Sequence, residues 1–259
     1  MKRAQNIFIK IIVVLSLIIT AANTTVFAQQ SQVNYKVTRI LMDSTWDRNN
    51  ESAVAEIIAL FKPQMERIMG EAIGVTDYEM RSGRPESLLS NFAADALLEF
   101  GREYSKRKVD FSLTNFGGLR ASLPKGEIRR FDLFSIFPFE NYVVILELPG
   151  SSVKKLFETF AKNRVEAISG NVNLKIRGGE LLMAQIDNNE IDMTKHYRVA
   201  TIDFLMDGGD NLLPLKEALS VERTDVLLRD AMIEKIQKET ALNRKITSSI
   251  TGRIEIIKD

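Results

Sequence analysis

Helical and strand-like segments follow one another in this chain of 259 residues without a repeating unit, and this irregular order most constrains its fold. Apolar residues at helical spacing predict a helix over 52–69 that Pro63 kinks or splits. A second helix is predicted over 88–104, directly before a short buried strand at 109–113. No repeated βα unit and no internal repeat is present. We therefore predict a single α+β domain of mixed helices and strands.

The remaining segments alternate in the same irregular way. A weak alternation of apolar and polar residues predicts a first strand over 33–42. Later segments are predicted as a strand over 142–148, a helix to Lys162 capped by Ser151 or Ser152, a hairpin of 172–176 and 181–186, a strand over 197–204, a helix from an Asp225 cap through Lys238, and a strand over 253–257.

The N-terminus has the composition of an export signal. Two basic residues precede an almost wholly apolar run over 11–22, and small residues lead up to Ala28. The run is shorter than the ~20 residues that cross a bilayer. We predict a signal peptide over 1–28 that is cleaved after Ala28, a mature domain over 29–259 in a periplasm-like space, and no stable membrane anchor after cleavage. The alternative is an uncleaved anchor.

The scarcity of nitrogen and sulfur ligands limits the chemistry. The chain has no cysteine and one histidine, His196, whereas zinc and two-metal hydrolases use several imidazoles. The sequence has no acidic loop typical of a calcium site and no Gly-x-Ser-x-Gly turn, although a triad through His196 is formally possible. We predict no metal site and no catalytic residue in this chain, and we expect His196 at the exposed start of a strand. The 35 basic and 34 acidic residues nearly cancel, which disfavours nucleic acid as a partner.

Three loops combine turn-forming residues with polar and aromatic ones. In the first, over 115–120, Gly117 and Gly118 allow a ligand to approach the backbone, and Arg120 offers a planar fork for phosphate or a ribose edge. Ordinary turn chemistry explains the same residues. In the second, over 137–141, aromatic residues flank a proline and form either an apolar platform or part of the core. The phenylalanines concerned are Phe131, Phe134, Phe137 and Phe139.

The third loop, over 204–210, places an aromatic residue before two glycines and a carboxylate. Phe204 could stack on a base and Asp210 could accept hydrogen bonds from ribose hydroxyls, although a tight turn also fits. Together the three loops hold what a nucleoside monophosphate requires: aromatic faces for the base, an acceptor for the diol and a guanidinium for the phosphate.

The motifs resemble a known family when they are taken in order. They are Leu-Ser-Asn-Phe-Ala-Ala-Asp-Ala at 89–96, Thr-Asn-Phe-Gly-Gly-Leu-Arg at 114–120, Phe-Pro-Phe-Glu-Asn at 137–141 and Phe-Leu-Met-Asp-Gly-Gly-Asp at 204–210. This series resembles the C-terminal, substrate-binding domain of the 5′-nucleotidase family, and the likeness runs from about Lys36 to the end of the chain.

The resemblance implies a role for each matching residue. The implied contacts are Phe139 and Phe204 on either side of the base, Asp210 on the ribose hydroxyls, Arg120 with Arg84 (or Arg81) on ribose and phosphate, Asn115 near the nucleoside, and Gly117 and Gly118 in the loop beside it. Asn91 and Asp95 also match and are interpreted as structural, through a hydrogen bond at a helix start and a loop tether. The chain departs from the family at Phe116, where a glycine is common, and at 210–212, so that Phe116 could narrow the pocket.

In the family that these motifs resemble, catalysis belongs to an N-terminal metallophosphatase domain with two metal ions. Residues 1–36 could not replace that domain. We therefore expect a member of a hydrolase family that is not a complete hydrolase by itself and has no cofactor of its own. It would be a nucleotide-binding component whose dimetal centre comes from a separate metallophosphatase chain. The alternatives are a free-standing periplasmic nucleotide- or nucleoside-binding protein, and a domain without ligand that is kept for protein contacts.

Overall fold

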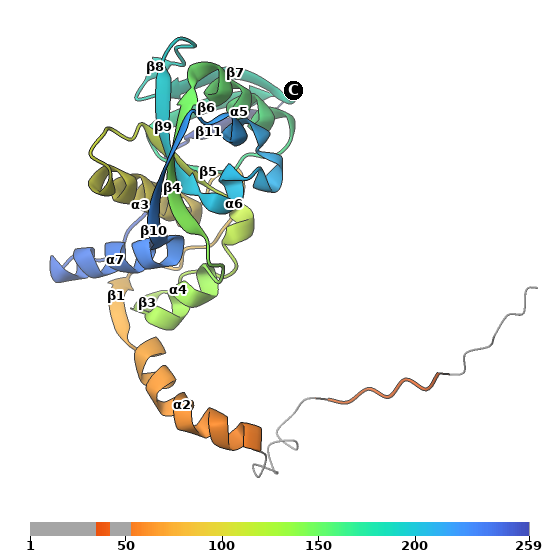
Figure 1. The fold of residues 1–259 in the computed structure, drawn as a ribbon, viewed down its shortest axis with the longest axis vertical. Coiled ribbons are helices and arrows are strands. Elements are labelled where there is room, and N and C mark those ends of the chain that lie inside the picture. Colours follow the sequence, from red (N-terminus) through yellow and green to blue (C-terminus); the bar gives the residue numbers. More distant parts are fainter. Residues whose placement is uncertain (1–34, 42–52, 259) are drawn as a thin grey trace, which may run out of the picture. The chain divides into compact units, whose positions relative to one another are not determined.

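A computed structural model describes residues 35–41 and 53–258 (Figure 1). The chain divides into two units, Met1–Ser52 and Ala53–Asp259. Residues 35–41 are neither helical nor part of a strand, so the strand predicted over 33–42 is wrong for the part that is described. The predicted signal peptide and its cleavage site lie outside the described residues.

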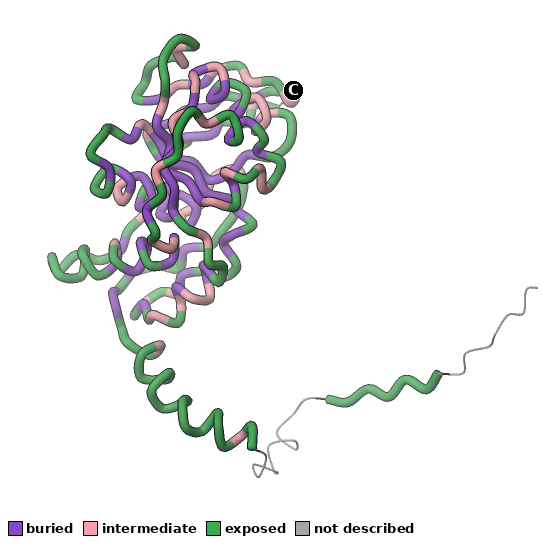
Figure 2. Tube along the Cα trace, in the orientation of Figure 1, coloured by how far each residue is buried: buried purple, intermediate pink, exposed green. Residues whose placement is uncertain are grey.

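A five-stranded sheet forms the centre of the second unit. Its strands, in spatial order, are β10 (Ser220–Leu227), β4 (Tyr142–Pro149), β9 (His196–Ile202), β2 (Phe111–Thr114) and β5 (Ala167–Ile168). β9 is antiparallel to β4 and parallel to β2, and β5 is antiparallel to β2. Figure 2 shows the inner strands of this sheet as the most deeply buried part of the molecule, as their runs of apolar residues require, whereas the edge strand β10 is largely exposed.

Two smaller sheets complete the strands. A four-stranded sheet has the order β11 (Ile254–Ile257), β6 (Val172–Arg177), β7 (Glu180–Ile186) and β8 (Asn189–Glu190), and a two-stranded sheet pairs β1 (Ala72–Thr76) with β3 (Gly126–Arg129). β6 and β7 form the predicted hairpin. The sheets mix parallel and antiparallel pairs and helices pack against them, which confirms the predicted α+β class.

Helix α3 (Leu88–Tyr104) occupies the range predicted for it and packs against β2 and β5. It begins with a capping box, in which the Ser87 hydroxyl accepts the backbone N–H of Ser90 and the Ser90 hydroxyl accepts that of Ser87. The helix ends at Tyr104, and the N–H of the next residue, Ser105, donates to the Gly101 carbonyl. Its buried face covers one side of the central sheet.

Two predicted helix caps are wrong. Helix α5 (Gly150–Lys162) begins directly after Pro149 and has no side-chain cap, while the Ser152 hydroxyl donates to Glu217 instead. Helix α7 (Leu228–Ala241) begins three residues after Asp225, which belongs to β10. In both cases the helix starts at the residue that follows the last residue of a strand, and no side chain caps it.

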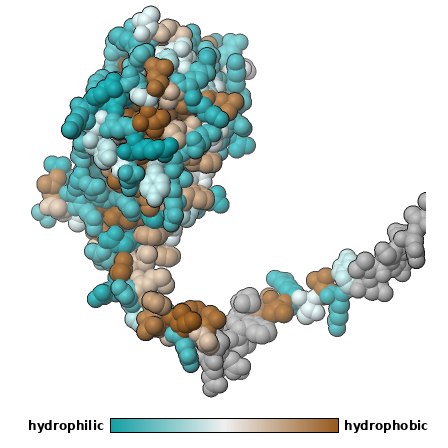
Figure 3. Space-filling model, viewed as in Figure 1, coloured by the Kyte–Doolittle hydropathy of each residue, from teal (hydrophilic) through white to brown (hydrophobic). Residues whose placement is uncertain are grey.

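Helix α2 (Ala53–Met69) matches the predicted range but is not split at Pro63. None of its residues is buried, so its apolar face is exposed; Figure 3 shows these side chains as brown atoms on the surface. Within the described part of the chain, no helix is both long and apolar enough to cross a membrane.

Candidate functional site

The topology of the central sheet brings four loops to one edge. Because β2 and β9 are parallel, their C-terminal ends reach the same edge, and the antiparallel strands β4 and β5 begin there. The segments at this edge are 115–120 after β2, 203–210 after β9, 137–141 before β4 and 163–166 before β5. The structure therefore brings the three loops predicted from the sequence together and adds a fourth.

The two phenylalanines expected to hold a base lie at neighbouring positions of this edge. Phe204 is in α6 (Asp203–Met206), directly after β9, and Phe139 lies shortly before β4. The backbone N–H of Tyr142 donates to Asp203 Oδ1 at 3.2 Å, which holds the start of β4 against α6. Phe139 and Phe204 are 47% and 44% exposed, so a flat ligand can reach both rings. Phe137, by contrast, is part of the core.

Asp210 is held by the loop that follows β2. Asn115 Nδ2 donates to Asp210 Oδ2 at 2.6 Å. A Cβ on Gly117 would lie 3.3 Å from Asn115 Nδ2 and one on Gly118 only 2.7 Å from Asn115 Oδ1, so glycine at both positions leaves room for this side chain. Asn115 Oδ1 is buried and, within the described residues, accepts no hydrogen bond.

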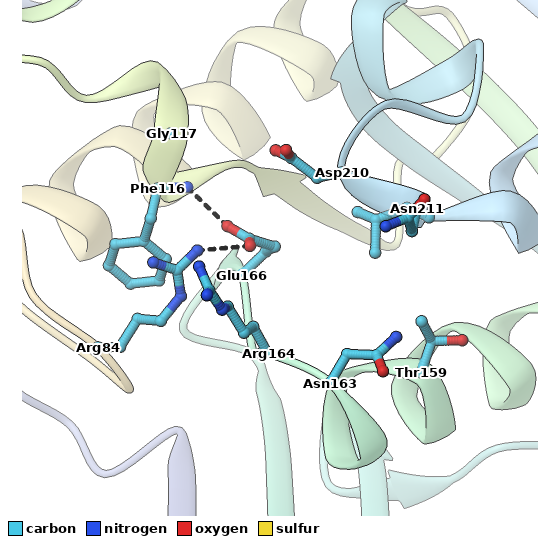
Figure 4. A pocket seen from close by; sticks show the side chains of 10 residues that line it. Arg84, Phe116, Gly117, Thr159, Asn163, Arg164, Glu166, Asp210 and Asn211 are labelled. Atoms are coloured by element: carbon cyan, nitrogen blue, oxygen red, sulfur yellow. Dashed lines mark hydrogen bonds and ion pairs between the residues drawn. The ribbon is translucent and has the colours of Figure 1, made fainter. Parts of the chain in front are cut away.

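The backbone at Asp210 is unusual. Asp210 and Asn211 have φ values of 52° and 60°, in the left-handed region that costs most residues about 1–2 kcal/mol. Aspartate and asparagine tolerate this conformation better than other non-glycine residues. The turn directs the Asp210 carboxylate toward Asn115 and the Asn211 side chain toward the cavity (Figure 4).

Arg84 is fixed by a buried carboxylate. Its Nη2 lies 2.6 Å from Glu166 Oε1 and its Nε donates to the Val165 carbonyl at 2.9 Å. The guanidinium carbon is 4.5 Å from the centre of the Phe116 ring, a cation–π distance. Phe116 is buried and supports Arg84 from one side. Its bulk, which the sequence suggested could narrow the pocket, serves in this way as part of the wall.

Glu166 links Arg84 to the glycine loop, the segment 115–120 after β2. Its second oxygen accepts the backbone N–H of Phe116 at 2.6 Å. Burial raises the pKa of the Glu166 carboxyl above its usual value, although the Phe116 N–H and the Arg84 guanidinium act in the opposite direction. Arg81, the other candidate for the phosphate partner, is exposed and pairs with Glu79.

Arg120 lies beside the aromatic pair. Its guanidinium carbon is 5.9 Å from the centre of the Phe139 ring, and its backbone N–H donates to the Ile136 carbonyl at 2.9 Å. Arg120 and Arg84 therefore occupy different parts of the site, the first next to a ring that could hold a base and the second in the adjoining cavity.

The cavity next to Asp210 has a volume of about 600 Å³. Its walls are Arg84, Phe116, Gly117, Thr159, Asn163, Arg164, Glu166, Asp210, Asn211 and Leu212 (Figure 4). Thr159, Asn163, Arg164 and Glu166 were not predicted as site residues, because no glycine motif marks them. Thr159 belongs to α5, and the pairing of Thr114 with Ala167, in a strand of two residues, brings the segment before β5 to the site.

The other residues singled out in the sequence lie elsewhere. Asn91 Nδ2 donates to the Ser249 carbonyl at 2.7 Å, and Asp95 pairs with Arg253 and accepts the Gly170 N–H, so both tie distant segments together. His196 is the first residue of β9 and its side chain is 54% exposed, as expected. Across the described ranges, no group of three or more acidic or histidine side chains is placed to hold a metal ion.

Comparison with known proteins gives consistent results. Residues 69–217 match the family described as "5′-nucleotidase, C-terminal domain". The chain is 28% identical over 215 residues to the trifunctional nucleotide phosphoesterase protein YfkN of Bacillus subtilis, covering 75% of this chain and 14% of that protein. It is 23% identical over 197 residues to protein UshA of Yersinia enterocolitica, covering 74% of this chain and 36% of that protein.

A similar fold occurs in a 5′-nucleotidase precursor from Thermus thermophilus. The two structures superpose with a TM-score of 0.67 at 22% identity, covering 79% of this chain and 43% of the other. The chain thus spans less than half the length of these relatives.

Proposed function

Because the chain belongs to the 5′-nucleotidase C-terminal domain family, we propose that it is the nucleotide-binding component of an exported 5′-nucleotidase-type phosphohydrolase. The observation that carries the proposal is the convergence of three loops at one sheet edge, where two accessible phenylalanines lie near a carboxylate held by Asn115. In this proposal Phe139 and Phe204 enclose the base, and Asp210 accepts hydrogen bonds from the ribose hydroxyls. Arg120 and Arg84 face the ribose and the phosphate.

Each group suits its part of the ligand. An aromatic face stacks on any base, and the ring of Phe139 already carries a guanidinium nearby. The carboxylate of Asp210 is exposed and has an oxygen that Asn115 does not occupy, and such an acceptor is what the O–H donors of a diol need. Because glycine has no side chain, Gly117 and Gly118 leave open the space around the side chains of Asn115 and Asp210.

The metal ions of the reaction would have to come from elsewhere. The one histidine, His196, begins β9 and is thus at the far end of that strand from the site, so the residues around the proposed nucleotide do not fit a dimetal centre. We propose that a metallophosphatase unit on a separate chain supplies the metals. The proposal is compatible with relatives that extend well beyond the matched segment.

The test is calorimetric titration of the purified protein with AMP in the presence of a chelator. We expect saturable binding that Phe139→Ala and Phe204→Ala each weaken by roughly tenfold, because stacking of a base on an aromatic ring contributes about 1–3 kcal/mol. Phe131→Ala is the matched control, since Phe131 is also exposed but lies on α4 (Arg130–Ile136), away from the site.

Three results would contradict the proposal. Equal AMP affinity in the wild type and both site variants would remove the stacking assignment. Absence of binding at millimolar AMP would remove the nucleotide as ligand. A loss of affinity in Phe131→Ala as large as in Phe204→Ala would show that the effect is not local.

A further inference from the structure

Arg229 is a buried cation with few partners. It is the second residue of α7 and is 8% exposed. Among the described residues, the one carboxylate within ion-pair distance belongs to Asp230, whose Oδ1 lies 3.9 Å from Arg229 Nε and whose side chain is 55% exposed. Arg229 Nε is buried and, in the part of the chain that the structure describes, donates no hydrogen bond. Burying a guanidinium in this way costs stability, so a stabilising role alone does not explain the residue.

The contacts that Arg229 does make lie where α4 ends. Its guanidinium carbon is 4.0 Å from the centre of the Phe134 ring, on α4, a close cation–π contact. Its Nη1 donates to the carbonyl of Phe137, the residue directly after α4, at 3.4 Å. Phe137 is the first residue of the segment 137–141, the aromatic loop, which carries Phe139. Arg229 therefore holds the start of this loop from the direction of α7, which packs against α4 (Figure 1).

The residue before Arg229 holds the other end of the aromatic loop. The backbone N–H of Leu228 donates to the Asn141 carbonyl at 2.9 Å. Two adjacent residues of α7 thus bind the first and the last carbonyl of a five-residue loop. The three residues between these ends, 138–140, are exposed, and Phe139 is the middle one. With both ends held, the first turn of α7 determines where the Phe139 ring can lie.

The end of the aromatic loop is also tied to the second ring of the proposed base site. Asp203 Oδ1 accepts the N–H of Tyr142, directly after the loop, at 3.2 Å and the N–H of Phe204 at 2.8 Å. One carboxylate oxygen therefore links this end of the loop to the residue that carries the other ring. The Arg229 side chain acts at the opposite end, so it limits how the loop can move relative to Phe204.

We propose that Arg229 is a positioning residue of the base site, which holds the Phe137 carbonyl and thereby fixes the Phe139 ring for stacking. The inference rests on the proposed function, in which Phe139 and Phe204 enclose the base. A ring that is held in place before the ligand arrives loses less conformational freedom when a base stacks on it. Arg229 then increases affinity for the nucleotide without touching it, at a cost to the stability of the domain.

The test is a double-mutant cycle on AMP binding, measured by calorimetry in the presence of a chelator. It compares the wild type, Arg229→Met, Phe139→Ala and the double variant. Methionine keeps an unbranched apolar side chain against Phe134 and removes the charge and the donors. We expect Arg229→Met to lower AMP affinity roughly fivefold, a part of the loss that removal of the Phe139 ring itself causes. In the Phe139→Ala background the same change should cause no further loss.

The cycle separates positioning from two simpler roles of Arg229. A long-range attraction between its charge and the nucleotide phosphate, or a general loosening of the domain, would lower AMP affinity equally in both backgrounds, and either result would overturn the proposal. Urea denaturation gives a second readout: Arg229→Met should keep or raise the midpoint, because a buried cation with few partners is removed. Arg130→Met is the matched control, since Arg130 also lies on α4 but pairs with Glu71, and it should bind AMP as the wild type does.

The remaining outcomes also decide the question. Unchanged AMP affinity in Arg229→Met overturns the proposal when Phe139→Ala still weakens binding, and the proposed function then stands. If Phe139→Ala leaves AMP affinity unchanged, the stacking assignment fails and the positioning role fails with it. If Arg229→Met does not fold, the cycle is measured with Arg229→Lys, which keeps the charge and loses the planar fork. That variant should show a smaller loss that again requires Phe139.

Discussion

Glu166 connects more parts of the site than any other single side chain. It accepts a hydrogen bond from the loop after β2 through the Phe116 N–H, and it holds Arg84, which comes from the segment before α3. Its own position is set by β5, which begins at the next residue. A buried carboxylate is costly unless its oxygens are satisfied, and here both are. We interpret Glu166 as the residue that positions Arg84 relative to the glycine loop.

The buried position of Glu166 predicts how stability varies with pH. Burial raises the pKa of Glu166 above the ordinary value of 4.5, so the folded protein binds this proton more tightly than the unfolded chain does. The free energy of unfolding must then fall as pH rises through the interval just above 4.5. Below that interval the carboxyl is protonated in both states, and the contribution is fully present.

Glu166→Gln replaces the titrating carboxyl by a neutral amide. Urea denaturation from about pH 4 to about pH 8 measures how the free energy of unfolding of the wild type and of the variant varies with pH. We expect the wild type to lose stability relative to the variant as pH rises through the interval. Parallel pH profiles would show that the carboxyl is not perturbed. A wild type that gains stability relative to the variant would show that its pKa is lowered, with Arg84 outweighing burial.

At the scale of elements, the segment after α7 ties the first helix of the core to two sheets. Arg253, which precedes β11, is 2% exposed and donates to both oxygens of Asp95 on α3. It also donates to the Ile168 carbonyl at the end of β5. The loop at Gly170 is held by the same carboxylate, whose Oδ1 accepts the Gly170 N–H at 2.7 Å. One ion pair thus joins a helix, two strands and a loop.

Asp95→Ala should therefore lower the free energy of unfolding by roughly 1.5–3 kcal/mol, because a buried guanidinium loses two hydrogen bonds to a charged acceptor and keeps only the more distant carboxylate of Glu86, at 3.6 Å. Glu99→Ala is the matched control on the same helix. Glu99 pairs with Lys235, which keeps Glu239 as a second partner, so its loss should cost less than about 1 kcal/mol. Equal losses in the two variants by chemical denaturation would contradict the structural role of Asp95.

Periodicity and turn chemistry predict some elements of this fold and miss others for physical reasons. Helix α3, the β6–β7 hairpin and strand β9 follow from runs of apolar residues that face a core. Strand β10 does not, because it is an edge strand of the central sheet, and its charged residues hide the pattern. β5 is missed because two residues carry no periodicity.

The same limits explain which site residues the sequence reveals. Asn115, Gly117, Phe204 and Asp210 belong to loops whose residue types are unusual in themselves. Arg164 and the other cavity residues from the α5–β5 connection are of ordinary types in an ordinary polar stretch. Their role depends on a strand pairing between segments far apart in the chain, which only the folded structure displays.

At the scale of the whole molecule, the site depends on one edge of one sheet, and the rest of the second unit holds that edge in place. The loops that face the proposed nucleotide come from four strands, so no isolated hairpin or helix could form the site. A ligand that contacts all of them binds the folded state and not the unfolded chain. Binding must therefore stabilise the whole domain and not only the loops.

We predict the size of this effect for AMP. At a free AMP concentration of about 100 times Kd, the folded state gains about 2.7 kcal/mol. For a domain of this size the gain corresponds to a rise in Tm of roughly 5–10 °C, which a thermal-shift assay in the presence of a chelator measures.

Asp210→Asn tests whether the ribose hydroxyls carry part of that shift. Asparagine tolerates the left-handed backbone conformation that Asp210 adopts, so the variant keeps the turn and loses the negative charge. At a fixed AMP concentration the variant should show a smaller rise in Tm than the wild type. With 2′,3′-dideoxy-AMP, which has no hydroxyl to donate, the two proteins should show the same small rise. If the variant loses the response to both ligands equally, Asp210 acts by shaping its loop and does not bind the diol.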